Sequence, residues 1–222
     1  MSVYIEIAGD EGMRIEKMVL GNMNNNTYII IGRDEKTALI VDPSYKPERI
    51  IEYISSLGLE LKAMLITHGH FDHIGAVDKI KAHYNVPVIT HEEEARIMAD
   101  SIKNLSTYFL AREVTATADT YIEDGDILDY GDDLVFKVIT VPGHSVKGVC
   151  YYSQEENVVF TGDTLLAGSI GRTDYYNGNQ SDLVEAINNR LMFLPDETKV
   201  FPGHGSDTTI RNEKKNNPFL QS

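Results

Sequence analysis

The chain of 222 residues carries a formal net charge of −14, with 42% hydrophobic and 24% charged residues. These proportions are ordinary for a globular protein with a sizeable core, and we expect one domain over residues 1–222. So acidic a chain, without a basic stripe, lacks the cations with which nucleic-acid-binding proteins contact phosphates. No apolar run approaches the roughly 20 residues of a membrane helix. The charge therefore argues against nucleic acid as the partner and the lack of a long apolar run argues against a membrane, whereas neither bears on a small molecule.

The start of the chain and its cysteine content bear on the compartment. The first residues, MSVYIEIAGD, contain no basic region followed by an apolar stretch and do not resemble a signal peptide. Cys150 is the single cysteine, so it has no internal disulfide partner. A single cysteine fits a reducing compartment, and we therefore expect a cytoplasmic protein. We also expect Cys150 to be a buried strand residue.

Short β-like runs alternate with helical segments in the first half of the chain. Runs rich in Ile, Val and Tyr predict strands over 5–8, 13–20, 27–32, 37–41, 62–67 and 86–90, with a loop over 22–26. Apolar residues at helical spacing predict helices over 47–57, 72–83 and 92–102. Residues 104–120 show no clear pattern, and we expect a loop near the functional site.

The β pattern returns in the second half. It predicts strands over 134–141, 148–153, 158–161 and 199–201, and helices over 182–194 and 208–215. Acidic runs at 92–94, 123–126 and 132–133 are interpreted as solvated faces and turns. Two strand-rich halves flanked by helices predict an α/β protein, with two stacked sheets and helices on their outer faces.

The strongest chemical signal is the motif Thr67-His68-Gly69-His70-Phe71-Asp72-His73. Alternate residues of an extended chain point the same way, so His68 and His70 can face one point. Asp72 and His73 follow where the chain turns into a helix, and they can face a second point nearby. Surface histidines on a turn are the simpler alternative, but three of only seven histidines fall in this window. Imidazole and carboxylate groups together suit zinc, iron or manganese.

Three further polar residues follow predicted strands. His144 stands in Val-Pro-Gly-His-Ser, Asp163 in Thr-Gly-Asp-Thr, and His204 in Phe-Pro-Gly-His-Gly. Each alone has an ordinary explanation as a polar turn residue. Four metal-competent segments at four strand ends favour a common site, because sheet proteins commonly carry their chemistry on such loops.

The motifs HGHFDH, PGHS, GDTL and PGHG, in this order, resemble those of the metallo-β-lactamase superfamily. The tracts LAGSIGRTDYYNG and PGHGSDTTIRNEKKNNPFL are similar to its glyoxalase II branch, and most of all to short, single-domain bacterial hydroxyacylglutathione hydrolase-like enzymes. The resemblance implies an αββα sandwich of two mixed β-sheets. It also implies that the chain lacks the C-terminal helical glutathione-binding domain of full-length glyoxalase II.

The resemblance further implies a set of site residues and two divalent metal ions, zinc in the first place and iron or manganese as alternatives. His68, His70 and His144 hold one ion; Asp72, His73 and His204 hold the other; Asp163 bridges the pair. Asp42 resembles an aspartate that orients a ligand histidine, although a turn before Pro43 explains it equally well from the sequence. Arg172 falls where related enzymes contact the anionic end of glutathione, and an ion pair with Asp174 is the equal alternative. Tyr175 and Tyr176 either line the pocket or pack.

The implied activity is hydrolysis of a thioester such as S-D-lactoylglutathione by a metal-bound hydroxide. Asp72 would hold the attacking water and Asp163 the two ions, and a thiolate leaves without a strong acid because its conjugate acid has a pKa of about 8.5. The chief alternative is an iron-dependent persulfide dioxygenase-like enzyme, which shares the Gly-Arg-Thr-Asp tract. A β-lactamase and a non-catalytic metal-binding protein rank below it. The chain reads His204-Gly205-Ser206 where full-length glyoxalase II tends to read His-Glu-Tyr.

Overall fold

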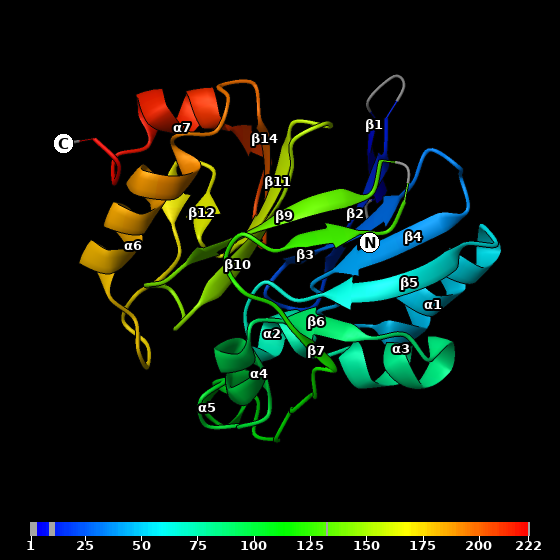
Figure 1. Ribbon diagram of the computed structural model, residues 1–222. Coiled ribbons are helices and arrows are strands. Elements are labelled where there is room, and N and C mark those ends of the chain that lie inside the picture. The colour runs from blue at the N-terminus through cyan, green and yellow to red at the C-terminus, as the bar shows by residue number, and fades with distance from the viewer. Residues whose placement is uncertain (1–3, 9–11, 132, 222) are drawn as a thin grey trace.

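The computed structural model describes residues 4–8, 12–131 and 133–221. Two β-sheets are stacked face to face, with helices on both outer faces (Figure 1). Helices α1 and α3 cover one sheet, and α6 and α7 cover the other. The predicted αββα sandwich is therefore confirmed. Among the described residues, no helix is long and apolar enough to cross a membrane.

The first sheet has seven strands, whose order in space follows the chain. The strands β1 to β4 pair antiparallel and β4 to β7 pair parallel. Their bounds are β1 (Tyr4–Ala8), β2 (Arg14–Leu20), β3 (Asn25–Ile31), β4 (Thr37–Val41), β5 (Glu60–Leu65), β6 (Val88–Thr90) and β7 (Thr120–Tyr121). The strand β3 begins two residues earlier than predicted, so Asn25 and Asn26 belong to the sheet rather than to the loop.

The second sheet has six strands, in the order β15-β14-β11-β10-β9-β8. Only the β11–β14 pair is parallel among these described strands. The bounds are β8 (Ile127–Asp129), β9 (Val135–Val141), β10 (Gly148–Ser153), β11 (Val158–Gly162), β14 (Lys199–Pro202) and β15 (Thr208–Thr209). Strands β12 (Leu165–Leu166) and β13 (Ser169–Ile170) form a separate hairpin.

The helices differ from the prediction mainly in where they are interrupted. Their bounds are α1 (Pro47–Ser56), α2 (Phe71–Ile74), α3 (Val77–Tyr84), α4 (Glu92–Met98), α5 (Ser106–Phe109), α6 (Gln180–Ala186), a π-helical turn η1 (Ile187–Leu191) and α7 (Ile210–Asn216). The predicted helix over 72–83 is two helices because Ala76 donates its N–H to the Pro43 carbonyl, outside the helix. A Cβ at Gly75 would lie 2.4 Å from the Ser44 carbonyl oxygen, so the chain approaches that segment too closely for a larger residue.

Three apolar layers hold the sandwich together. Alternate residues of a strand face opposite sides of its sheet. Thus Ile29 packs under the helices α1 and α3, whereas Tyr28 packs between the sheets. In the second sheet, Phe160 packs between the sheets and Val159 packs against α6. Because both faces of β3, β10 and β11 are covered, these strands are buried throughout and do not alternate between apolar and exposed polar residues.

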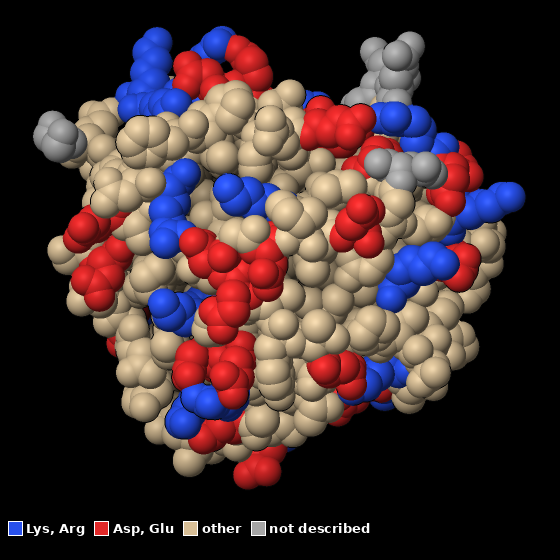
Figure 2. Space-filling model, in the orientation of Figure 1, with Lys and Arg blue, Asp and Glu red and all other residues tan. Residues whose placement is uncertain are grey.

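Charged side chains lie mostly at the surface, where acidic and basic groups intermingle on the face shown in Figure 2. Two residues of the acidic runs contradict the prediction that those runs are solvated. Glu94 and Asp133 are both fully buried. Asp133 accepts hydrogen bonds from the backbone N–H of Arg33 at 3.0 and 3.2 Å, while Glu94 belongs to the functional site. Asp132 lies outside the described residues.

Two buried tyrosines tie the sheets together in opposite directions. Tyr28 of β3 donates its hydroxyl to the Pro202 carbonyl of β14 at 2.7 Å. Tyr151 of β10 donates to the Ile66 carbonyl, directly after β5, at 2.8 Å. Burial raises the pKa of Tyr151 well above its usual value, so the hydroxyl stays protonated and remains a donor. These bonds connect strand ends that carry the metal-competent motifs.

Replacement of Tyr151 by Phe tests this link. Loss of the hydroxyl leaves the buried Ile66 carbonyl without that donor, which costs about 1–2 kcal/mol of the free energy of unfolding. Urea denaturation should show the loss, with Tyr121→Phe, an exposed strand residue, as the matched control. Equal stability of the two variants would contradict the assigned role.

Candidate functional site

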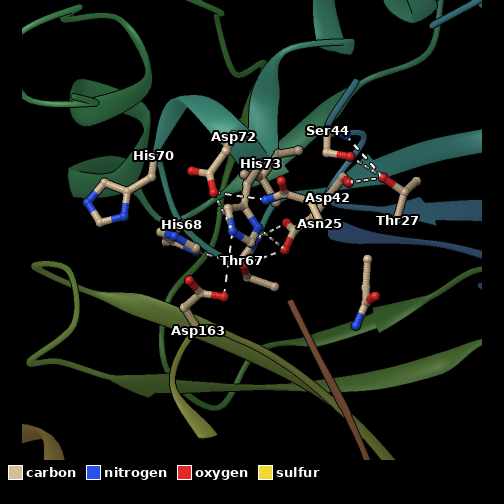
Figure 3. Close-up of polar contacts among 12 residues, drawn as sticks. Asn25, Thr27, Asp42, Ser44, Thr67, His68, His70, Asp72, His73 and Asp163 are labelled. Carbon is tan, nitrogen blue, oxygen red and sulfur yellow. Dashed lines mark hydrogen bonds and ion pairs between the residues drawn. The ribbon is translucent and has the colours of Figure 1, made fainter. Parts of the chain in front are cut away.

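The four motifs come together where their strands end, at one edge of the interface between the sheets. The HGHFDH segment follows β5, and the other three motifs follow β9, β11 and β14. The side chains of HGHFDH and Asp163 lie close together in Figure 3. The structure thus brings together all seven residues that the resemblance implies as ligands: His68, His70, Asp72, His73, His144, Asp163 and His204.

The first group consists of His68, His70 and His144, all of them buried. The Nε2 atom of His144 lies 3.2 Å from Nε2 of His68 and 3.1 Å from Nδ1 of His70. Three nitrogens at the usual bond length from a tetrahedral zinc ion would be roughly 3.3 Å apart. The spacing is therefore that of three ligands around one ion.

The second group consists of Asp72, His73 and His204. Oδ2 of Asp72 lies 3.3 Å from Nε2 of His204 and 3.8 Å from Nε2 of His73. Asp163 lies between the groups, because its Oδ1 is 3.6 Å from His73 and its Oδ2 is 3.8 Å from His144. A single carboxylate thus reaches both groups.

Asp42 forms a third close set with His68 and His73, but its oxygens already have partners. Oδ1 accepts from the Thr67 N–H at 2.8 Å, and Oδ2 accepts from the Thr67 hydroxyl at 2.7 Å and from Nδ1 of His73 at 2.9 Å. Figure 3 shows His73 between Asp42 on one side and Asp72 and Asp163 on the other. Asp42 therefore orients the His73 ring through a hydrogen bond, and its oxygens are not free to act as metal ligands.

Hydrogen bonds to Nδ1 fix four of the five imidazoles. A carboxylate or carbonyl oxygen only accepts, so His73 donates to Asp42, His144 to the Arg172 carbonyl at 2.7 Å, and His204 to the Met23 carbonyl at 3.1 Å. Nδ1 of His68 is 3.0 Å from the Thr67 hydroxyl, whose own proton goes to Asp42. In the neutral form of each of these four rings, Nε2 is therefore the unprotonated nitrogen, and it is directed into the cluster.

The charges in the cluster shift its pKa values in different directions. Burial, and then the imidazoles of His73 and His70, lower the pKa of His68, while burial and His144 bring that of His70 to about 3. Burial also disfavours protonation of His73, but Asp72, Asp163 and Asp42 outweigh it and raise its pKa. For Asp163, burial is outweighed by His73 and His204, and its pKa is lowered to about 2. The imidazoles of the first group are therefore uncharged near neutral pH, whereas the second group contains charged side chains.

The donor set fits divalent metal ions. Nε2 of His73 and Oδ1 of Asp163 are buried and have no hydrogen-bond partner within the described chain. In the first group, the unprotonated Nε2 atoms of His68 and His144 face each other at 3.2 Å, an arrangement that a cation between them stabilises. A Cβ at Gly203 would lie 2.5 Å from Oδ1 of Asp163 and 2.6 Å from the His73 ring, so the Pro-Gly turn leaves this space to the cluster. Histidine and aspartate side chains suit zinc and iron alike.

Two residues near the cluster escaped the sequence analysis. Asn25 donates its side-chain amide to Oδ2 of Asp72 at 2.9 Å. Glu94 of α4 accepts from the backbone N–H of Gly69 at 2.9 Å and from that of Lys147 at 2.7 Å, so it connects the two loops of the first group. Neither contact leaves a local pattern, because the partners are far away in sequence. In Glu94 the only signal is its place on the apolar face of α4, beside Ala95 and Met98.

A cavity of about 430 Å³ opens above the cluster. Tyr175 and Arg172 both line it. The Arg172 guanidinium, however, forms two hydrogen bonds with Asp174, at 2.9 and 2.7 Å, and lies 4.4 Å from the centre of the Tyr175 ring. Of the two alternatives for Arg172, the structure shows the ion pair. Tyr176 is exposed in the neighbouring cavity.

The Glu94→Gln variant tests whether this carboxylate positions the first group. The amide keeps one acceptor oxygen but turns an N–H₂ group towards a backbone N–H, which costs about 1–3 kcal/mol of unfolding free energy. We also expect metal affinity to fall by about tenfold or more, because groups behind the ligands orient them. Competition with a chelator measures the affinity. Glu93→Gln, on the exposed side of the same helix, is the control, and equal affinity of both variants would exclude this role for Glu94.

Metal uptake should depend on pH through the second group. The raised pKa values of His73 and His204 mean that the metal-free cluster holds protons near neutral pH. For His204, burial opposes the shift and the hydrogen bond with Asp72 produces it. These protons must leave when metal binds, so the apparent affinity should fall as the pH is lowered through the neutral range. Calorimetry in two buffers of different ionisation enthalpy counts the released protons. A pH-independent affinity without proton release would contradict the assignment.

Two relatives match nearly the whole chain. The "Probable metallo-hydrolase YqgX" of Bacillus subtilis is 39% identical over 209 residues, which cover 94% of this chain and 98% of the relative. The "Hydroxyacylglutathione hydrolase GloC" of Haemophilus influenzae is 37% identical over 195 residues, which cover 87% and 92%.

Solved structures are similar over the same range. The structure of "BLEG-1 B3 metallo-beta-lactamase" has a TM-score of 0.89 and 38% identity, and the match covers 94% of this chain and 100% of that one. The di-iron-bound form of "TTHA1623" has a TM-score of 0.80 and 32% identity, covering 91% and 98%. "ETHE1 from Myxococcus xanthus" has a TM-score of 0.74 and 29% identity, covering 97% and 83%.

The family model described as "Metallo-beta-lactamase superfamily" matches residues 20–204. This range includes the strand ends and every histidine and aspartate of the cluster. The chain belongs to the metallo-beta-lactamase superfamily.

Proposed function

We propose that the chain is a thioester hydrolase of the glyoxalase II type, with two metal ions, zinc in the first place, and S-D-lactoylglutathione or a related hydroxyacyl thioester as substrate. The observation that carries the proposal is the pair of adjacent three-residue groups, bridged by Asp163 and open to one cavity. The similarity of the chain to the Haemophilus influenzae hydroxyacylglutathione hydrolase supports the proposed class of substrate.

In this proposal each group of side chains holds one ion. His68, His70 and His144 would hold the first, Asp72, His73 and His204 would hold the second, and Asp163 would contact both. The spacing of the nitrogens in the first group and the unpartnered Nε2 of His73 support the assignment. Asp42 fixes the His73 ring through Nδ1.

When bound, two such ions lower the pKa of a shared water and polarise the substrate carbonyl. The chain positions the reactants. Asp72 uses Oδ2 for Asn25 and His204, so its Oδ1 can accept a proton of the attacking water. Tyr175, which lies edge-on to His70, bounds the cavity over the first group and limits the space for bulk water. The departing thiolate needs no general acid, because its conjugate acid has a pKa of about 8.5.

Two other activities have specific support in the comparisons. The likeness to a protein described as a B3 metallo-beta-lactamase makes a β-lactam the second candidate substrate. The likeness to ETHE1 supports a persulfide dioxygenase with a single iron. The second group of Asp72, His73 and His204 offers ligands for a second ion, and a two-ion site supports the hydrolase.

Metal analysis of the native protein, coupled to an assay of S-D-lactoylglutathione cleavage, tests the proposal. We expect two ions per chain and thioester cleavage at the metal-loaded site. The His144→Ala variant should lose at least about a hundredfold in kcat/KM, because the first ion loses one of its three imidazoles. His83→Ala removes an exposed histidine outside the cluster and should match the wild type.

Three results would contradict the proposal. One iron per chain with oxygen uptake on glutathione persulfide would establish the dioxygenase. Cleavage of β-lactams with no cleavage of thioesters would establish the lactamase. No turnover of any of these substrates by the metal-loaded protein would exclude all three enzymes.

A further inference from the structure

We propose that a cationic groove beside the metal cleft, lined by Tyr45, Lys46, Lys79 and Arg112, binds the anionic end of the substrate's thiol half. This inference rests on the proposed thioester activity. The groove has a volume of about 580 Å³ and lies between the β2–β3 turn, the start of α1, and the segment after α5. Neither the sequence motifs nor the relatives' names assign a role to these residues.

The groove is continuous with the catalytic cavity. Met23, Phe71 and Phe109 line both of them. Phe109 also lines a third, mostly apolar cavity of about 520 Å³ on the other side, together with Leu105, Tyr108 and Tyr175. A substrate whose carbonyl lies over the cluster can therefore extend one end past Phe109 into the cationic groove, and the other end into the apolar cavity.

The groove carries a net positive charge in a chain whose formal net charge is −14. Lys79 pairs with Glu48 at 2.7 Å, and Glu48 also lines the groove. In the part of the chain that the structure describes, no carboxylate lies within 4.0 Å of the charged groups of Lys46 and Arg112. Two exposed cations thus remain available at the entrance of the cleft, where they attract anionic ligands.

Arg112 is better placed for this task than Arg172, the residue that the sequence motif suggests. Arg172 donates two hydrogen bonds to Asp174, which satisfies its charge within its own loop. Arg112 keeps its planar set of donors free to bind a carboxylate or phosphate through two hydrogen bonds. Arg172, beside the cluster, is therefore already paired with a carboxylate, whereas Arg112, farther along the cleft, is available for a ligand.

Tyr45 links the groove to the cluster. Burial raises its pKa to about 12, the negative charge of Asp72 adds to the rise, and Arg112 partly opposes it. The Tyr45 hydroxyl is therefore within electrostatic reach of both the metal cluster and the groove, and it remains a hydrogen-bond donor at neutral pH. Its ring packs so closely on Gly21 that a Cβ there would lie 2.1 Å from it, which fixes the tyrosine against the β2–β3 turn.

The ligand chemistry that fits is a thiol with a carboxylate or phosphate several bonds from the sulfur. Glutathione offers carboxylates and coenzyme A offers phosphates. A neutral thiol such as N-acetylcysteamine has the same sulfur chemistry but no group for Arg112. Comparison of the S-methyl thioethers of these three thiols isolates the contribution of the anion, since thioethers bind without being cleaved.

The test is calorimetric binding of the three thioethers to the metal-loaded protein and its Arg112→Met variant. We expect the wild type to prefer at least one anionic thioether over the neutral one, and Arg112→Met to weaken that ligand about fivefold, with neutral binding unchanged. The preference should also decrease at high salt. Glu48→Gln, which removes the partner of Lys79, should strengthen anion binding. Arg211→Met, an exposed arginine of α7, is the charge-matched control and should bind like the wild type.

The outcomes separate this inference from the proposed function. Equal binding of anionic and neutral thioethers by the wild type, or unchanged anion binding in Arg112→Met, overturns the groove. Arg112-dependent binding of the glutathione or the coenzyme A thioether identifies carboxylate or phosphate as the recognised anion. If such binding persists while no thioester is cleaved, the proposed reaction fails and the anion site stands.

Discussion

The structure depends on one constraint, which is that nitrogen lone pairs and carboxylates are concentrated in a place shielded from water. Unpaired polar groups are costly to bury, and the groups of this cluster face one another instead of solvent. Hydrogen bonds on the outer side of four of the five rings hold the imidazoles in this arrangement, and Asp42 and Thr67 take part in two of these anchors. The fold supplies rigid strand ends for these anchors, and divalent cations satisfy the inner side.

Much of this arrangement could be predicted from the sequence. The HGHFDH motif is contiguous, and the other ligand candidates follow apolar runs that predict strands. The packing of two sheets between helices follows from the alternation of the apolar residues. Local patterns do not encode contacts between distant segments, however. The run of asparagines predicts a loop through Asn25, because asparagine favours turns. The strand β3 nevertheless continues through it, because Asn26 donates its N–H to the Gly203 carbonyl.

Glu94 shows the same limit for charged residues. Three successive glutamates are typical of a solvated helix start, and Glu92 and Glu93 do pair with Arg96 at the surface. The third glutamate turns inward because two backbone N–H groups of the metal loops need an acceptor. The helix predicted over 72–83 is interrupted for a similar reason, because the Pro43 carbonyl accepts a hydrogen bond from the N–H of Ala76. In each case a tertiary hydrogen bond outweighs the local preference.

The three cavities that share Phe109 make the two ends of the cleft chemically different. The metal cluster lies between an apolar side and a cationic side, so the two halves of an extended substrate meet different chemistry. The paired Arg172 and the available Arg112 illustrate that a motif position alone does not determine which cation meets the ligand. Binding of the remote end can then hold the reactive carbonyl over the cluster.

The most direct measurement is anomalous X-ray diffraction from crystals of the metal-loaded protein. We expect two peaks, one among His68, His70 and His144 and the other among Asp72, His73 and His204, with Asp163 in contact with both. A single peak in the first group at full metal loading, with Asp72 and His204 unliganded, would contradict this expectation.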